Sequence, residues 1–166
     1  MTMIITLIGS SKFEPYFHVW NEVLTLSGHL VFGLSTYPSV KQSREWYTVH
    51  EKRILDHVHK QKIDASSAVL LLNVDAYIGE STLSELQHAH DKRKNIYALE
   101  SWGRGCGVWD NHTDAARAHK RKYGISDDYM SPVDTSKFLC VWNLLPEAGA
   151  FRSKLVDRVR SLGAGE

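Results

Sequence analysis

Residues 69–89, VLLLNVDAYIGESTLSELQHA, join a short apolar run to a helical pattern through a polar turn. The run at 69–74 is almost entirely aliphatic, which is typical of a strand buried on both faces of a parallel sheet. Beyond the turn, Leu83, Leu86 and Ala89 recur at helical spacing and predict a helix over 81–94. A buried strand followed directly by an amphipathic helix indicates the α/β fold class.

The same alternation of strand and helix patterns continues on both sides of this stretch. Further strands are predicted at residues 4–8, 30–34, 96–99 and 138–142. Further helices are predicted between Phe13 and Gly28 and at 44–66, 114–123 and 146–162. Alternating strands and helices form parallel sheets through right-handed crossovers. We therefore expect residues 1–166 to form one three-layer α/β/α domain around a five-stranded parallel sheet, flavodoxin/Rossmann-like in strand order.

The composition is that of an ordinary soluble globular protein. Hydrophobic residues make up 43% of the 166 residues, charged residues 23%, and the formal net charge is +1. So small a charge attracts neither nucleic acid nor an anionic membrane strongly, so neither is expected as a partner. The first apolar run is too short for a signal sequence or a membrane span. The only cysteines, Cys106 and Cys140, argue against a disulfide framework, so we expect a cytoplasmic protein.

Two loops leave the carboxyl ends of predicted strands, where open parallel sheets bind their ligands. The first, Gly9-Ser10-Ser11-Lys12, combines a flexible backbone, two hydroxyls and a cation just before a helix, which suits an anion. The spacing alone favours a simpler interpretation, a turn in which Ser11 caps the helix. The second loop covers residues 75–81, DAYIGES. The paired histidines at 57/59 and 88/90 point to different faces of their helices, so no metal site is predicted.

Glu85 has two competing interpretations. Thr82 followed three residues later by Glu85 matches the capping box, in which the glutamate turns back onto the first backbone N–H of its own helix. A glutamate near the start of a helix that follows a buried strand is also placed to face a ligand at the edge of the sheet. The pattern alone favours the capping box.

Three segments together resemble the nucleoside 2-deoxyribosyltransferase-like superfamily, which includes the deoxynucleoside 5′-monophosphate N-glycosidases. The segments are GSSKF, ILDHVHKQKID and VLLLNVDAYIGESTLSELQHAHDKRKNIYALE, and the resemblance spans residues 4–100. Residues 101–166 match no motif of the family, and we expect them to complete the fold or to form a dimer interface.

The resemblance implies an enzyme that cleaves the N-glycosidic bond of a 2′-deoxynucleoside or its 5′-monophosphate, by hydrolysis or base exchange. The family nucleophile falls on Glu85, which would form a covalent deoxyribosyl intermediate. Asp75 is the first candidate for the acid that protonates the leaving base, and Glu80 is the second. The predicted substrate-binding residues are Gly9, Ser10, Lys12, Tyr77, Gly79, Glu80, Ser81 and Thr82.

The resemblance also implies a homodimer or larger homo-oligomer, and no cofactor is expected. The chain departs from the family pattern in places. Thr6 stands where relatives often carry Tyr, Ser66-Ser67 replaces an Ala-Asp pair, and Lys60 or a neighbour replaces an aspartate. A nucleotide-binding or sensing protein that uses the same crevice without turnover is therefore the alternative function.

Overall fold

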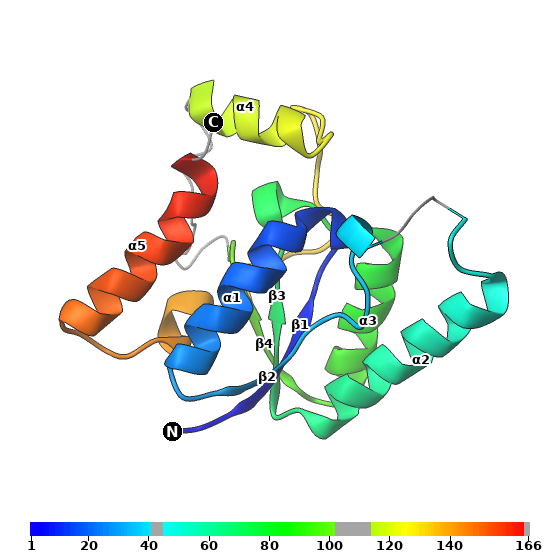
Figure 1. Ribbon diagram of the computed structural model, residues 1–166, viewed down its shortest axis with the longest axis horizontal. Helices are drawn as coiled ribbons and strands as arrows, with labels where there is room; N and C mark the ends of the chain where they lie inside the picture. Colours follow the sequence, from blue (N-terminus) through cyan, green and yellow to red (C-terminus); the bar gives the residue numbers. More distant parts are fainter. Residues whose placement is uncertain (41–44, 102–113, 165–166) are drawn as a thin grey trace.

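The computed structural model describes residues 1–40, 45–101 and 114–164, and its centre is a five-stranded sheet (Figure 1). The strands are β1 (Ile4–Ile8), β2 (Leu30–Phe32), β3 (Ala68–Leu71), β4 (Asn95–Ala98) and β5 (Leu139–Cys140). All neighbours pair in parallel, in the order β2-β1-β3-β4-β5. This is the flavodoxin-like order, so the predicted fold class and strand order are confirmed.

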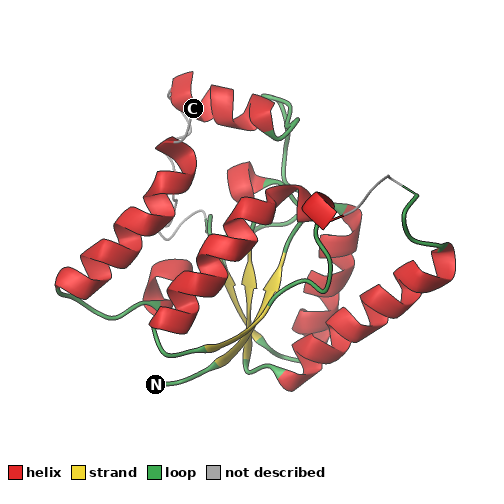
Figure 2. Ribbon diagram, viewed as in Figure 1, coloured by secondary structure: helices red, strands yellow, loops and turns green. Residues whose placement is uncertain are grey.

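Helices cover both faces of the sheet and complete the three layers (Figure 2). One face carries α1 (Glu14–Leu26) and α5 (Ala150–Ala164), which pack against each other. The other face carries α2 (Val49–Ala65) and α3 (Glu80–Asp91), which also form a pair. The short α4 (Asp114–Lys122) lies beyond the carboxyl ends of the strands (Figure 1). No described helix is long and apolar enough to cross a membrane.

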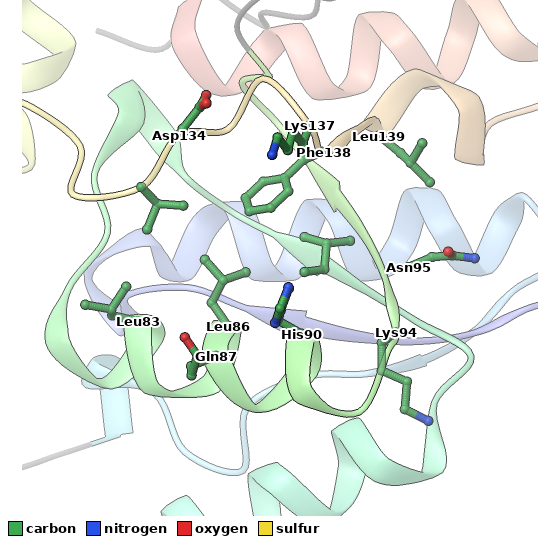
Figure 3. A pocket seen from close by; sticks show the side chains of 12 residues that line it. Leu83, Leu86, Gln87, His90, Lys94, Asn95, Asp134, Lys137, Phe138 and Leu139 are labelled. Carbon is green, nitrogen blue, oxygen red and sulfur yellow. The ribbon is translucent and has the colours of Figure 1, made fainter.

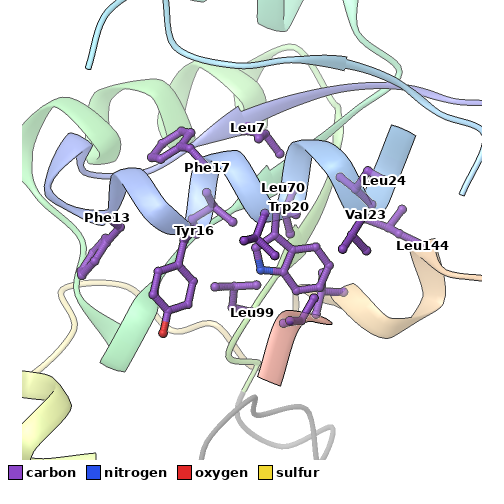
Figure 4. Close-up of a cluster of buried hydrophobic side chains, with 14 of the residues drawn as sticks. Leu7, Phe13, Tyr16, Phe17, Trp20, Val23, Leu24, Leu70, Leu99 and Leu144 are labelled. Carbon is purple, nitrogen blue, oxygen red and sulfur yellow. The ribbon is translucent and has the colours of Figure 1, made fainter. Parts of the chain in front are cut away.

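Strand β3 joins the two hydrophobic cores. Leu70 and Leu72 belong to the larger core, where the aromatic rings of α1, including Trp20, pack onto the sheet (Figure 4). Val69 and Leu71 belong to the smaller core beneath α2 and α3. Because successive side chains of a strand point to opposite faces, a strand buried on both sides must be apolar throughout, which explains the aliphatic run.

Helix α2 contacts the core less than its sequence predicts. The sequence pattern places Val49, Ile54, Leu55, Val58 and Ile63 in the core. Of these only Ile63 is buried, and Val49 and Ile54 are 68% and 48% exposed, so the prediction is wrong for the latter two. The helix begins at Val49 behind a Thr48 capping box, and its first half extends past the sheet (Figure 1). His59 is buried in the face that approaches the sheet.

The edge strand β5 is shorter than predicted, because the chain turns into a 3-10 helix at Val141–Leu144. Cys140 on this strand is disulfide-bonded, although the two cysteines argue against a disulfide framework. Cys106 lies outside the described residues. The cysteine content therefore no longer supports a reducing compartment.

Because β3 is buried and the start of α2 is exposed, shortening a side chain should lower the free energy of unfolding much more in β3 than in α2. Leu70→Ala should lower the free energy of unfolding by about 2–5 kcal/mol, because it removes a fully buried side chain from the larger core. Val49→Ala is the control and should change it by less than about 1 kcal/mol, because the side chain is exposed. Urea unfolding followed by tryptophan fluorescence measures both. Equal losses in the two variants would contradict the described packing.

Candidate functional site

A hollow of about 510 Å³ opens at the carboxyl end of β1, between α2 and α3. Its walls are the turn at residues 9–11, the loop at 34–36, one face of α2 and the start of α3 with Glu85. We call it the Glu85 hollow. It lies at the carboxyl ends of the neighbouring strands β1 and β3, from which the chain continues to α1 on one face of the sheet and to α3 on the other. Open parallel sheets bind ligands at such a position.

The capping-box interpretation of Glu85 is wrong, because α3 starts earlier than the pattern assumes. Gly79 is the N-cap residue, it makes no side-chain cap, and the first helical hydrogen bond runs from Leu83 N–H to the Gly79 carbonyl (2.9 Å). Thr82 therefore lies inside the first turn. Glu85 lies one turn further along, and its side chain lines the hollow.

The first turn of α3 presents its free backbone N–H groups at the wall of the hollow. The N–H groups of Glu80, Ser81 and Thr82 precede the first helical hydrogen bond, so they have no partner within the helix. All three residues and Gly79 line the hollow. With the helix dipole, this end of α3 favours an anionic group.

Glu85 is a buried carboxyl group that forms no ion pair with a lysine or arginine among the described residues. Its residue is 8% exposed, and its Oε2 has no hydrogen-bond partner in the same part of the chain. Burial raises the pKa of Glu85 to about 8, the neighbouring Asp56 adds to the rise, and Lys60 opposes it. The carboxyl group therefore holds its proton at neutral pH.

His59 lies beside Glu85 but does not neutralise it. Its Nε2 is 3.9 Å from Oε1 of Glu85 and donates a hydrogen bond to the Leu7 carbonyl at 3.1 Å. Burial lowers the pKa of His59 to about 4, and the nearby Lys62 lowers it further. The ring is thus neutral at physiological pH. In the sequence, His59 stands out only as a possible metal ligand beside His57. Its position one turn before the buried Ile63 could have indicated its inward orientation.

The turn after β1 forms the opposite wall. The Ser10 side chain accepts a hydrogen bond from the Lys12 N–H (3.4 Å), and Gly9 lies so close to β3 that a Cβ there would stand 3.1 Å from the Leu72 Cβ. Gly9 and Ser10 line the hollow, as predicted. Lys12 does not line it. Its ammonium group lies 3.8 Å above the ring of Tyr77, which does not line the hollow either.

Asp75, the first candidate for the proton donor, is placed elsewhere. Its buried carboxylate accepts a hydrogen bond from Nδ1 of His119 at 2.7 Å, and it does not line the Glu85 hollow. The carboxyl groups that do line the hollow beside Glu85 are those of Asp56 and Glu80. The structure therefore joins seven predicted residues in one site and leaves three outside. The seven are Gly9, Ser10, Gly79, Glu80, Ser81, Thr82 and Glu85; the three are Lys12, Asp75 and Tyr77.

Two of the departures from the family pattern contact each other. The hydroxyl oxygens of Thr6 and Ser66 lie 2.5 Å apart in the buried interior. Ser66 donates its own hydrogen to the Lys62 carbonyl (2.8 Å), so Thr6 is the donor between the two hydroxyls. The pair thus satisfies its own polar groups, and neither hydroxyl lines the hollow.

A second hollow of about 520 Å³ lies between α3 and residues 133–139 (Figure 3). Apolar side chains, including Leu86 and Phe138, form much of its lining, and the polar residues around it are not buried. Nothing there resembles the buried carboxyl group of the first hollow. The described residues contain no group of His, Cys, Asp or Glu side chains arranged to hold a metal ion.

No protein-family model matches the sequence, and no curated protein matches it either. Among solved structures, the crystal structure of a conserved protein from Enterococcus faecalis V583 aligns with 98% of this chain and 99% of its own. The two sequences are 11% identical, and the TM-score is 0.46.

Removing the charge of Glu85 should stabilise the protein at alkaline pH. The folded state holds this proton up to about pH 8, whereas an unperturbed glutamate releases it near 4.5. The unfolded chain therefore ionises first, and the wild-type protein loses stability as pH rises between these values. Glu85→Gln should raise the free energy of unfolding near pH 9 by about 2–4 kcal/mol and have little effect near pH 4.

Urea unfolding at several pH values measures this difference. Glu22→Gln is the matched control, because Glu22 is a half-exposed carboxylate paired with Arg158 on the surface. It should change stability by at most about 1 kcal/mol at any pH. A Glu85→Gln variant that is less stable than the wild-type protein near pH 9 would show that the carboxylate is ionised and favourably bound.

Proposed function

We propose that the protein cleaves the N-glycosidic bond of a 2′-deoxynucleoside or its 5′-monophosphate, with Glu85 as the nucleophile. The placement of Glu85 is the observation that supports this proposal. Its side chain lines a hollow at the carboxyl end of the sheet, and it is not engaged in capping its own helix. A buried carboxyl group without a partner costs stability, which is common where a group serves chemistry.

The walls of the hollow suit a nucleotide phosphate. The first turn of α3 offers free N–H groups together with the hydroxyls of Ser81 and Thr82. Ser10 adds a hydroxyl from the opposite wall, and Lys52 of α2 supplies a cation in place of Lys12. These groups favour the 5′-monophosphate over the free nucleoside.

The proposed reaction proceeds in two steps. In the first, the Glu85 carboxylate attacks the anomeric carbon, the bond from that carbon to the base breaks, and its electron pair leaves with the base. Asp56 or Glu80 supplies a proton to the departing base, since both carboxyl groups line the hollow. In the second step water attacks the same carbon, releases Glu85 and returns a proton to the acid. The net change is hydrolysis with retention at the anomeric carbon.

The predicted homodimer or larger assembly stays a prediction. Its support is the exposure of three apolar side chains in and just before α2: Trp46 (45% exposed), Val49 (68%) and Ile54 (48%). A cytoplasmic location also stays a prediction.

The Glu85→Gln variant separates an enzyme from a sensor. A panel of 2′-deoxynucleosides and their monophosphates is incubated with the protein, and free base is measured by chromatography. Glu85→Gln should lower kcat about a thousandfold or more, because an amide cannot form the glycosyl ester. Affinity should change less than about threefold, because glutamine has the shape of the protonated carboxyl group.

The control for this experiment is again Glu22→Gln, which should keep full activity because Glu22 pairs with Arg158 on the surface. A wild-type protein that binds a monophosphate but releases no base would instead be the nucleotide-binding or sensing protein.

The pH dependence should report the ionisation of Glu85. Because attack needs the carboxylate, and burial raises the pKa of this group to about 8, kcat/KM should rise with pH and level off above that value. Initial rates at low substrate concentration across the pH range measure the profile. A rate that falls through this region would mean that Glu85 acts in its protonated form, as the acid.

A further inference from the structure

The loop between β3 and α3 is strained. Asp75 and Ala76 have φ angles of 52° and 64°, so two consecutive residues other than glycine adopt the left-handed conformation. An aspartate tolerates this region better than an alanine, and both cost free energy relative to ordinary backbone. Three residues later the chain reaches Gly79, the N-cap of α3. The strained residues therefore direct the chain into the helix that lines the Glu85 hollow.

Residues from distant parts of the chain hold this loop in place. His119 of α4 binds Asp75 through Nδ1 (2.7 Å), and its other ring nitrogen binds the Tyr16 hydroxyl of α1 (2.7 Å). The ring of Tyr16 packs in the larger core (Figure 4), so the chain of contacts ends in that core.

Tyr129 holds the same loop at a second point. Its hydroxyl accepts a hydrogen bond from the Ile78 N–H and donates one to the Ile78 carbonyl, both at 3.1 Å. Tyr129 thus satisfies both the backbone N–H and the backbone carbonyl of Ile78, the residue before Gly79. Its ring also lies against that of Tyr77, with centroids 5.1 Å apart.

We propose that residues 119–129, together with Tyr16, form a brace that keeps residues 75–79 in their strained conformation and so fixes the first turn of α3 at the Glu85 hollow. His119 and Tyr129 are positioning residues, since neither lines the hollow. The brace gives a role to part of the C-terminal region that the family resemblance leaves unmatched. Its effect on catalysis rests on the proposed function, whereas its effect on the loop does not.

The charges around Asp75 explain why the loop depends on His119. Asp75 is buried, and its Oδ1 has no hydrogen-bond partner among the described residues. The buried carboxyl group of Glu100 lies near enough that Asp75 helps to raise its pKa to about 7, after the larger effect of burial. Without the His119 ring, Asp75 would lose the hydrogen bond to Oδ2 while still facing a second acidic group. The least costly response is for the strained loop to relax.

Amide hydrogen exchange tests the brace without reference to activity. In the full-length protein, His119→Ala and Tyr129→Phe should speed exchange of the hydrogen-bonded amides of Ala76, Tyr77 and Leu83 about tenfold or more, with β1 and β3 unchanged. His119→Asn should restore most of the protection, because its amide can donate to Asp75 from the position of Nδ1. His57→Ala is the control, because His57 is an exposed histidine on α2 that does not line the hollow.

Exchange at Ala76, Tyr77 and Leu83 that rises no more than exchange at β1 and β3 would overturn the proposal, and so would a failure of His119→Asn to restore protection. For any monophosphate that the panel shows to be cleaved, His119→Ala should raise KM more than it lowers kcat. An unchanged KM despite faster local exchange would overturn the link to the hollow. Faster local exchange in a protein that cleaves no member of the panel would support the brace and refute the glycosidase function.

Discussion

The burial of β3 on both faces is the constraint on which the rest of the structure depends. Alternate side chains of this strand enter opposite cores, so helices must cover both sides of the sheet. The chain meets this requirement by placing α1 and α5 on one face and α2 and α3 on the other. The carboxyl ends of β1 and β3 are then neighbours, and the chain leaves them towards opposite faces of the sheet, to α1 and to α3. That divergence opens the Glu85 hollow, and the loop after β3 brings α3 to its wall.

Stability and chemistry place opposite demands on α3. Leu86 and Ala89 are buried in the smaller core and stabilise the fold. The neighbouring Glu85 is buried with one carboxyl oxygen that has no hydrogen-bond partner among the described residues, and the first N–H groups of the helix have no helical partner. Such unfavourable groups persist when the surrounding packing is strong enough to tolerate them. Their concentration at one hollow distinguishes it from the second hollow, whose polar residues are not buried.

The sequence allows the fold to be predicted well, because local patterns reflect the two cores directly. The run at 69–74 identifies the central strand, and the alternation around it gives the five-stranded parallel sheet. The sequence also singles out Glu85 and the loop before it, although its pattern alone favours a capping box. The start of α3 is predicted to within one residue, but the left-handed residues before Gly79 and the contact between His119 and Asp75 are not predicted. The partner of Asp75 is 44 residues away, and no local pattern predicts such a pairing.

The long-range contacts of residues 75–79 also have a consequence for biosynthesis. Strands β1 to β4 lie within the first 98 residues, whereas His119 is 44 residues beyond Asp75 and Tyr129 is 51 beyond Ile78. Since a chain emerges from the ribosome amino end first, most of the sheet can pair before these partners have been translated. A nascent chain of this protein should therefore acquire a native-like sheet first and become competent to bind ligand only later.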